Sequence, residues 1–206
     1  MDFARIDRYW PLVVGGVAAP IVLTVLLVIL VRDGGAISYQ WLLWLHLPLF
    51  NFHEYEEYLL PGGFKHFVNA DSPLAARPPS DDAPLNDAYE FAVNAFFWAI
   101  IIAGALLANV APWVGLVGVM LQLGVNNLTH TVAFQTRRRG YNPGLVTTVF
   151  VLLPYCTLVI AYIIVTSLFT AADWVLGIGV SLLPVLVMLA ITLIRRRHAG
   201  VAGTTR

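Results

Sequence analysis

Long apolar stretches alternate with short polar interruptions along the whole chain. Residues 10–31 contain no charged side chain, and further predominantly apolar stretches follow at 39–60, 87–109, 112–136, 143–170 and 174–194. An α-helix rises about 1.5 Å per residue, so roughly 20 residues cross a hydrocarbon core of about 30 Å. The pattern predicts an all-α, polytopic membrane protein whose six transmembrane helices form a bundle. We expect one transmembrane domain over residues 1–206, because no linker divides the chain.

The connection at 61–86 differs in composition from the stretches around it. Pro61-Gly62-Gly63 is typical of a helix end, and Pro78-Pro79-Ser80-Asp81-Asp82 indicates a loop. Connections of this length are uncommon in compact domains and often have a function. We therefore predict a cytoplasmic loop over 61–86 that could act as a lid.

Composition supports the membrane class and excludes others. The chain is 59% hydrophobic and only 12% charged, against about 25% charged residues in soluble domains. Its formal net charge of zero argues against nucleic acid as a partner, because a phosphate-binding surface needs a basic excess. A single cysteine rules out a disulfide within the chain.

The basic residues are distributed unevenly between the two ends of the predicted bundle. With six spans and an inside N-terminus, eleven of the 12 Lys and Arg residues lie on one side, and Arg32 lies on the other. Positive residues concentrate on the cytoplasmic side of membrane proteins. We expect a multi-pass protein of the cell (inner) membrane with cytoplasmic N- and C-termini. A re-entrant helix at 39–60 would scatter these charges over both sides.

A cluster of ionisable residues lies near the end of the 39–60 stretch, at His53-Glu54-Tyr55-Glu56-Glu57. Residues three and four apart share a helix face, so His53, Glu56 and Glu57 are expected to point the same way. An imidazole beside two carboxylates suits zinc, manganese or iron better than calcium or magnesium. Glu54 lies further round the helix, as a supporting or solvated carboxylate. The structural alternative is a solvated helix end.

Two later stretches carry polar pairs at similar depth, each with i, i+4 spacing. Ionisable groups inside a membrane are costly and usually face a functional cavity. We therefore predict a buried polar site near the cytoplasmic leaflet, built from three helices. The candidate metal ligands are His53, Glu56, Glu57, Glu90, Asn94, Asn126 and His130, with His46 as a weaker candidate.

Each of the later residues also has a structural interpretation. Glu90 lies three residues after Asp87, which is the spacing of a capping box. Asn126 and His130 could form an interhelical hydrogen bond without a metal. His46 could be a core histidine whose hydrogen bonds are satisfied.

The segment 137–144, with the sequence RRRGYNPG, is a second local signal. It has the features of a helix end followed by a capped helix start, with arginines that could meet an anionic leaflet. Arg139 could instead turn inward and pair with a carboxylate or an anionic substrate. We include Arg139 with Glu56 and Glu57 as a candidate catalytic residue.

These motifs together resemble a known family. His53-x-x-Glu56-Glu57, the later Asn126 and His130, and the arginine-rich segment before Gly144 are similar to the bacterial integral membrane proteins named after their HXXEE motif. The resemblance covers about residues 40–165, with the first and last helices as flanking additions. It implies a shared polar site and does not specify a reaction.

The leading hypothesis is a membrane-embedded metal-dependent enzyme with non-haem iron, one or two ions, that oxidises a hydrophobic small molecule by hydroxylation, desaturation or N-oxidation. Its expected partners are membrane lipid, this substrate and an electron-donor protein. A zinc-dependent hydrolase of a lipid-like substrate would use the same ligands, with Glu56 or Glu57 as general base. A proton- or cation-coupled transporter or a lipid-binding scaffold is the third alternative, and the chain shows no inverted repeat to support it.

Overall fold

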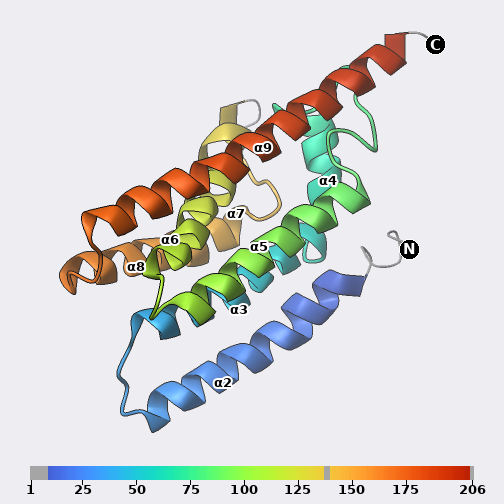
Figure 1. Cartoon of the computed structure of the whole chain (residues 1–206). Coiled ribbons are helices and arrows are strands. Elements are labelled where there is room, and N and C mark those ends of the chain that lie inside the picture. The colour runs from blue at the N-terminus through green and yellow to red at the C-terminus, as the bar shows by residue number, and fades with distance from the viewer. Residues whose placement is uncertain (1–8, 137–139, 205–206) are drawn as a thin grey trace.

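The computed structural model describes residues 9–136 and 140–204, and within these ranges every regular element is helical, with no strand. The helices run alongside one another in an elongated bundle (Figure 1). The prediction of an all-α protein is confirmed.

The first half of the chain forms three long helical rods. The first rod comprises the π-helical segment η1 (Leu12–Ala18) and α2 (Ala19–Arg32), the second is α3 (Tyr39–Tyr58), and the third is α5 (Asp87–Leu107). Caps define where the last two begin. The Ser38 hydroxyl accepts a hydrogen bond from the Trp41 amide at 3.1 Å, and the Asn86 side chain accepts one from the Tyr89 amide at 3.0 Å.

The second half is less regular, because π-helical turns interrupt two of its rods. The elements in chain order are α6 (Pro112–Leu121), η3 (Gln122–Asn127), η4 (Thr129–Ala133), η5 (Phe134–Thr136), α7 (Leu145–Thr147), η6 (Thr148–Leu152), α8 (Leu153–Val165) and α9 (Ala171–Thr204). The continuous helices predicted at 112–136 and 143–170 are therefore each broken, and the second ends at Val165. The last helix begins and ends beyond its predicted limits of 174–194.

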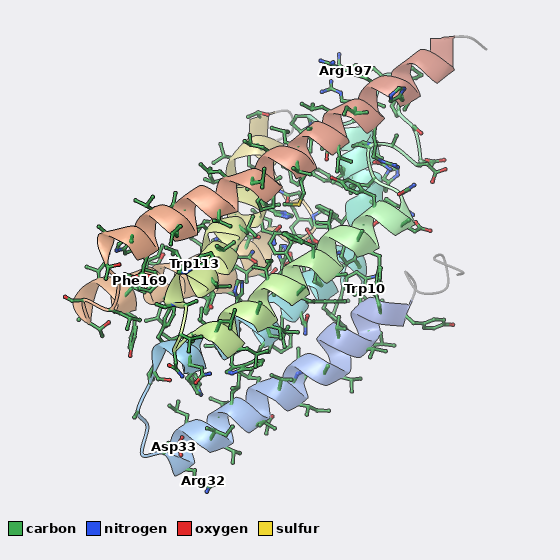
Figure 2. The ribbon with its side chains drawn as sticks, viewed as in Figure 1. Trp10, Arg32, Asp33, Trp113, Phe169 and Arg197 are labelled. Carbon is green, nitrogen blue, oxygen red and sulfur yellow. The ribbon has the colours of Figure 1, made fainter. Side chains whose placement is uncertain are left out.

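Connections gather at the two ends of the bundle in an alternating way. The connections 33–38, 108–111 and 166–170 lie at one end, whereas the 59–86 segment and both described ends of the chain lie at the other (Figure 1). Figure 2 shows the same separation in side chains, with Arg32 at the first end and Arg197 at the second. This is the up-and-down order expected from the sequence.

Helix α3 occupies the middle of the bundle, in contact with α2, α5 and α8. Small residues let its neighbours approach closely: a Cβ atom built on Gly15 of η1 would lie 2.6 Å from the Cβ atom of Tyr55. Because neighbouring helices cover α3, its inward-facing polar side chains are shielded. His46, Asn51, His53, Glu54, Glu56 and Glu57 are all buried.

The prediction of six membrane-spanning helices is only partly supported. In the described part of the chain, four helices are long and apolar enough to cross a membrane: Tyr9–Arg32, Asp87–Leu107, Leu145–Val165 and Ala171–Gly200. Helix α3 is long enough but too polar in composition, because it carries three glutamates and two histidines, and α6 has only ten residues before the backbone widens into η3. Both deviations lie in the rods that form the candidate site.

The 59–86 segment is partly helical rather than a simple loop. It contains α4 (Phe64–His66) and η2 (Phe67–Asp71), and Phe67 and Val68 form an apolar cluster with Phe134. Lys65 forms an ion pair with Asp87 at the start of α5. The segment therefore packs against this end of the bundle as a cover.

Candidate metal centre

His53, Glu57 and His130 bring three potential metal ligands together in the interior. The His130 Nε2 and His53 Nε2 atoms lie 3.0 Å and 3.4 Å from Glu57 Oε1. All three side chains are at least 95% buried. Ligand atoms of the three residues lie within 4.8 Å of one another, and within the described ranges this is the group of histidine, cysteine and acidic residues close enough to hold a metal ion.

Hydrogen bonds to the other ring nitrogens assign the tautomer of both histidines. The Thr147 hydroxyl donates its hydrogen to Glu56 Oε2 at 2.6 Å, so it accepts from His53 Nδ1 at 2.9 Å. The Asn142 amide nitrogen donates to the His130 carbonyl at 3.1 Å, so its oxygen accepts from His130 Nδ1 at 2.6 Å. When both rings are neutral, their Nε2 atoms therefore carry lone pairs directed towards Glu57.

Three electron-pair acceptors facing one another repel, unless a cation or protons lie between them. Separations of 3.0–3.4 Å match neighbouring donors around one ion with bonds of about 2.1 Å. Metal-binding histidines usually donate their second ring N–H to an oxygen in this way. The donor set, its burial and its outer hydrogen bonds all fit a transition metal.

Gly144 closes this group from the side of α7. A Cβ atom at this position would lie 2.7 Å from the Cε1 atoms of both His53 and His130 and 2.9 Å from Glu57 Cγ. Gly144 also adopts φ of +91°, which side chains rarely tolerate. Only glycine lets the backbone approach the three side chains at this point.

Glu56 lies next to Glu57 in sequence but faces a different element. Successive helical residues point about 100° apart, and the Glu56 carboxylate turns towards the start of α7. It accepts hydrogen bonds from the Val146 and Thr147 amides, at 3.1 Å and 2.7 Å, and from the hydroxyls of Thr147 and Tyr141, at 2.6 Å and 3.0 Å. Burial and the neighbouring Glu56 charge raise the pKa of Tyr141, so this phenol stays a donor.

Glu54 and Glu90 are two further buried acids near the three residues. Glu54 is 1% exposed and interacts electrostatically with Glu57 and Glu90. Its Oε2 atom has no hydrogen-bond partner among the described residues. Glu90 is 2% exposed, and the cap of α5 is Asn86 rather than Asp87, so the capping-box interpretation of Glu90 is not borne out. Buried acids need a compensating cation or a proton.

A cavity of about 320 Å³ lies beside the three residues, between α3, α5, η3, η4 and α9. Its polar wall contains Glu57, Tyr58, Glu90, Asn94, Asn126, Thr129 and His130. Its apolar wall includes Phe64 and Val68 of the 59–86 segment together with Val185, Met188 and Leu189 of α9. No lysine or arginine is among the described residues that line it. The cavity can hold a small, largely apolar molecule next to Glu57 and His130.

Of the other predicted site residues, some line the cavity and some lie away from His53, Glu57 and His130. Asn94 and Asn126 line the cavity, and Asn94 donates to the Tyr58 hydroxyl at 3.1 Å. His46 lies outside the group: it is buried and hydrogen-bonded to Gln122 at 3.3 Å. Arg139 falls outside the described residues.

Sequence reasoning missed two residues that hold the histidines in place. Asn142 lies in the segment where a capped helix start was expected, but the cap of α7 is Gly144 and the Asn142 side chain binds His130. Thr147 links His53 to Glu56 and had no signal of its own. The Asn142-Pro143-Gly144 triplet was the available clue, because it combines an amide with two backbone-restricting residues.

The fold and the site define an all-helical protein that has four helices able to cross a membrane and a buried histidine–carboxylate group beside an apolar cavity. Residues 44–159, more than half of the chain, match the family described as "Protein of unknown function with HXXEE motif". The chain belongs to this HXXEE family. No curated protein and no solved structure matches it.

Proposed function

We propose that the protein is a membrane-embedded, metal-dependent oxidoreductase that acts on a hydrophobic small molecule held in the cavity beside His130. One observation supports this proposal most strongly: two imidazole lone pairs and one carboxylate oxygen converge in a buried place. Two histidines and one carboxylate are the ligand set of non-haem iron(II) oxygenases. The residues support one ion, held by His53, Glu57 and His130.

Bound iron(II) would supply the activation of dioxygen, and the chain supplies the surroundings. Hydroxylation of a C–H bond consumes O₂, two electrons and two protons, and yields an alcohol and water, so an electron-donor protein is required. Glu90 lines the cavity together with Glu57 and His130, where it would accept or supply protons. The apolar walls exclude bulk water from the reacting groups.

The cavity supports a substrate that is mainly hydrocarbon with a small polar end. Its volume of about 320 Å³ is near the lower limit of small-molecule sites, about 300–1,000 Å³. The polar wall places Asn94, Asn126 and Thr129 beside Glu57 and His130. The substrate would orient its polar end towards this wall and its apolar part towards α9.

We further propose that all six rods cross the membrane, with the 59–86 segment and both termini on the cytoplasmic side. Four rods meet the requirement for apolar length by themselves. Helix α3 and the α6–η4 rod would cross because their polar residues face the protein interior instead of lipid. The site would then lie near the cytoplasmic leaflet, and a molecule dissolved in the membrane would reach it past α9.

Zinc-dependent hydrolysis is the second candidate, because two histidines and a glutamate also form the zinc site of several hydrolases. Glu57 would be a ligand and Glu56 faces α7, so Glu90, which lines the same cavity, would replace them as the general base for a zinc-bound water. This alternative requires no electron donor. The hydrolase and the oxidoreductase are distinguished by which metal, zinc or iron, supports turnover.

Nitric oxide binding tests the oxidoreductase proposal without knowledge of the substrate. Anaerobic protein loaded with iron(II) should give the spin-3/2 signal of a non-haem iron–nitrosyl complex, because a site with three protein ligands leaves positions open. The His130→Gln variant should lose the signal. A wild-type protein that takes up stoichiometric zinc but gives no iron–nitrosyl signal would favour the hydrolase.

A further inference from the structure

A second pocket lies away from the candidate metal centre, where the last turns of α9 meet the 72–86 part of the long connection. It is lined by Arg77, Leu193, Arg196, Arg197 and Gly200. A Cβ atom on Gly200 would lie 3.1 Å from the carbonyl oxygen of Arg77, so the two segments are in contact here. Arginines about 120 positions apart in sequence therefore line one pocket.

Among the described residues, none that lines this pocket balances its positive charge. No acidic residue is among the described residues that line it, and Arg77, Arg196 and Arg197 make no ion pair within the described ranges. The neighbouring Arg195 does not line the pocket. Its guanidinium donates hydrogen bonds to the carbonyl oxygens of Pro84 at 2.7 Å and Asp82 at 3.0 Å. Guanidinium groups bind phosphate through paired hydrogen bonds.

The surroundings of this pocket are apolar. The helix that carries Arg196 and Arg197 presents a long apolar surface before them, and Leu183, Leu186 and Ile194 are 67%, 61% and 53% exposed. Leu193 adds an apolar contact within the pocket itself. A ligand whose phosphate group contacts the arginines, and whose hydrocarbon chains lie along the apolar surface of α9, matches this arrangement.

We propose that the Arg77–Arg196–Arg197 pocket binds the phosphodiester group of an anionic phospholipid, whose acyl chains lie along α9. The bound lipid links the 59–86 segment to α9, so it stabilises the two elements that form the apolar wall of the cavity. Its binding requires no metal and does not depend on the reaction proposed above.

Native mass spectrometry of the purified full-length protein tests the proposal with dioleoyl phosphatidylglycerol and dioleoyl phosphatidylcholine as probes. The wild type should retain phosphatidylglycerol in preference. The Arg196→Gln, Arg197→Gln double variant should bind it roughly 25-fold more weakly, since each arginine near the surface contributes about fivefold. Arg77→Gln, which changes only the arginine from the 59–86 segment, should weaken phosphatidylglycerol binding about fivefold.

Arg32→Gln is the matched control, because it removes an exposed arginine at the opposite end of the bundle (Figure 2). It should bind phosphatidylglycerol as the wild type does. Equal binding of both lipids by the wild type would overturn the proposal, and so would a loss in Arg32→Gln as large as in Arg77→Gln. Complete competition by millimolar inorganic phosphate would assign the pocket to a free anion and overturn the lipid assignment.

Discussion

His53 and His130 each use Nδ1 for a hydrogen bond and direct Nε2 at the same oxygen of Glu57. The partners of the two Nδ1 atoms, Thr147 and Asn142, lie on either side of Gly144, within a few residues of each other. One short segment therefore orients two rings that come from different rods. At the residue scale, this segment determines the geometry of the site as much as the HXXEE motif does.

Replacing Gly144 by alanine tests how closely the backbone must approach the site. The new Cβ atom would collide with His53 and His130, so Gly144→Ala should abolish metal binding, measured as metal equivalents per purified chain. The strained φ should also lower the stability by roughly 1–3 kcal/mol, measured as a fall in the melting temperature.

Gly63→Ala provides the matched control for this variant. Gly63 also precedes a short helix with φ of +90°, but a Cβ atom there would meet nothing within 4 Å. It should lose similar stability and keep its metal. Loss of metal in both variants would mean that backbone strain, rather than contact with the two rings, controls the site.

The sequence predicts the histidine–carboxylate centre at residue level only in part. The i, i+4 spacing correctly places His53 and Glu57 on one helix face. The expectation that polar residues lie at a similar depth in the membrane correctly places His130 near them. Glu56 was expected to join them, but its hydrogen bonds to the start of α7 depend on the path of 141–147, which no helical periodicity encodes. Asn142 was missed for the same reason, because its partner His130 is twelve residues away in sequence.

At the scale of elements, the π-helical segments η3 and η4 distinguish the rod that carries His130. A π-turn inserts an extra residue and often occurs at functional sites. Here it places Asn126, Thr129 and His130 together on the wall of the cavity. The sequence pattern predicted one regular helix at 112–136, because hydrophobic periodicity does not reveal a local change in the number of residues per turn.

Helix α9 provides a second test at this scale, because it supplies part of the apolar wall although it lies outside the matched 44–159 region. Met188→Trp should fill the cavity and exclude an apolar ligand without removing metal. The measurement is fluorescence of N-phenyl-1-naphthylamine with cobalt(II)-loaded protein, since the paramagnetic ion quenches only probe bound beside it. The wild type should quench the probe, and Met188→Trp should not.

Leu186→Trp controls for the added indole ring, because Leu186 lies two residues away on α9 with 61% of its surface exposed. It should quench as the wild type does. Unchanged quenching in Met188→Trp would show that the probe reaches the metal without occupying this cavity.

At the scale of the whole molecule, the up-and-down order of the rods makes a prediction about the membrane. If all six rods cross, single cysteines at Ala36, Asn109 and Leu168 lie on one side, and those at Asp81 and His198 lie on the other. The expected result is that an impermeant maleimide added to intact cells labels only the first three positions. The buried Cys156 is replaced by alanine in the background.

Labelling of Ala36→Cys from the cytoplasmic side would show that α3 does not cross and that the site lies at the membrane surface. The sequence predicted the alternation of the rods because apolar length is a local property. In the part of the chain that the structure describes, four rods have sufficient apolar length by themselves, and the sequence could not show how the more polar rods are shielded. That outcome depends on which rods the others cover, and α3 can be polar because α2, α5 and α8 surround it.

Elemental analysis of detergent-purified protein tests most directly whether the group of His53, Glu57 and His130 holds a metal. The test compares variants of two buried histidines on the same helix, α3. His53→Gln should lose the metal, whereas His46→Gln should retain it, because His46 is bonded to Gln122 and lies outside the group. The account predicts about one equivalent of iron or another transition metal per wild-type and His46→Gln chain, as expected for a single buried three-ligand site. Wild-type protein without bound metal after anaerobic purification and iron(II) loading, or equal metal content in His53→Gln and His46→Gln, would contradict it.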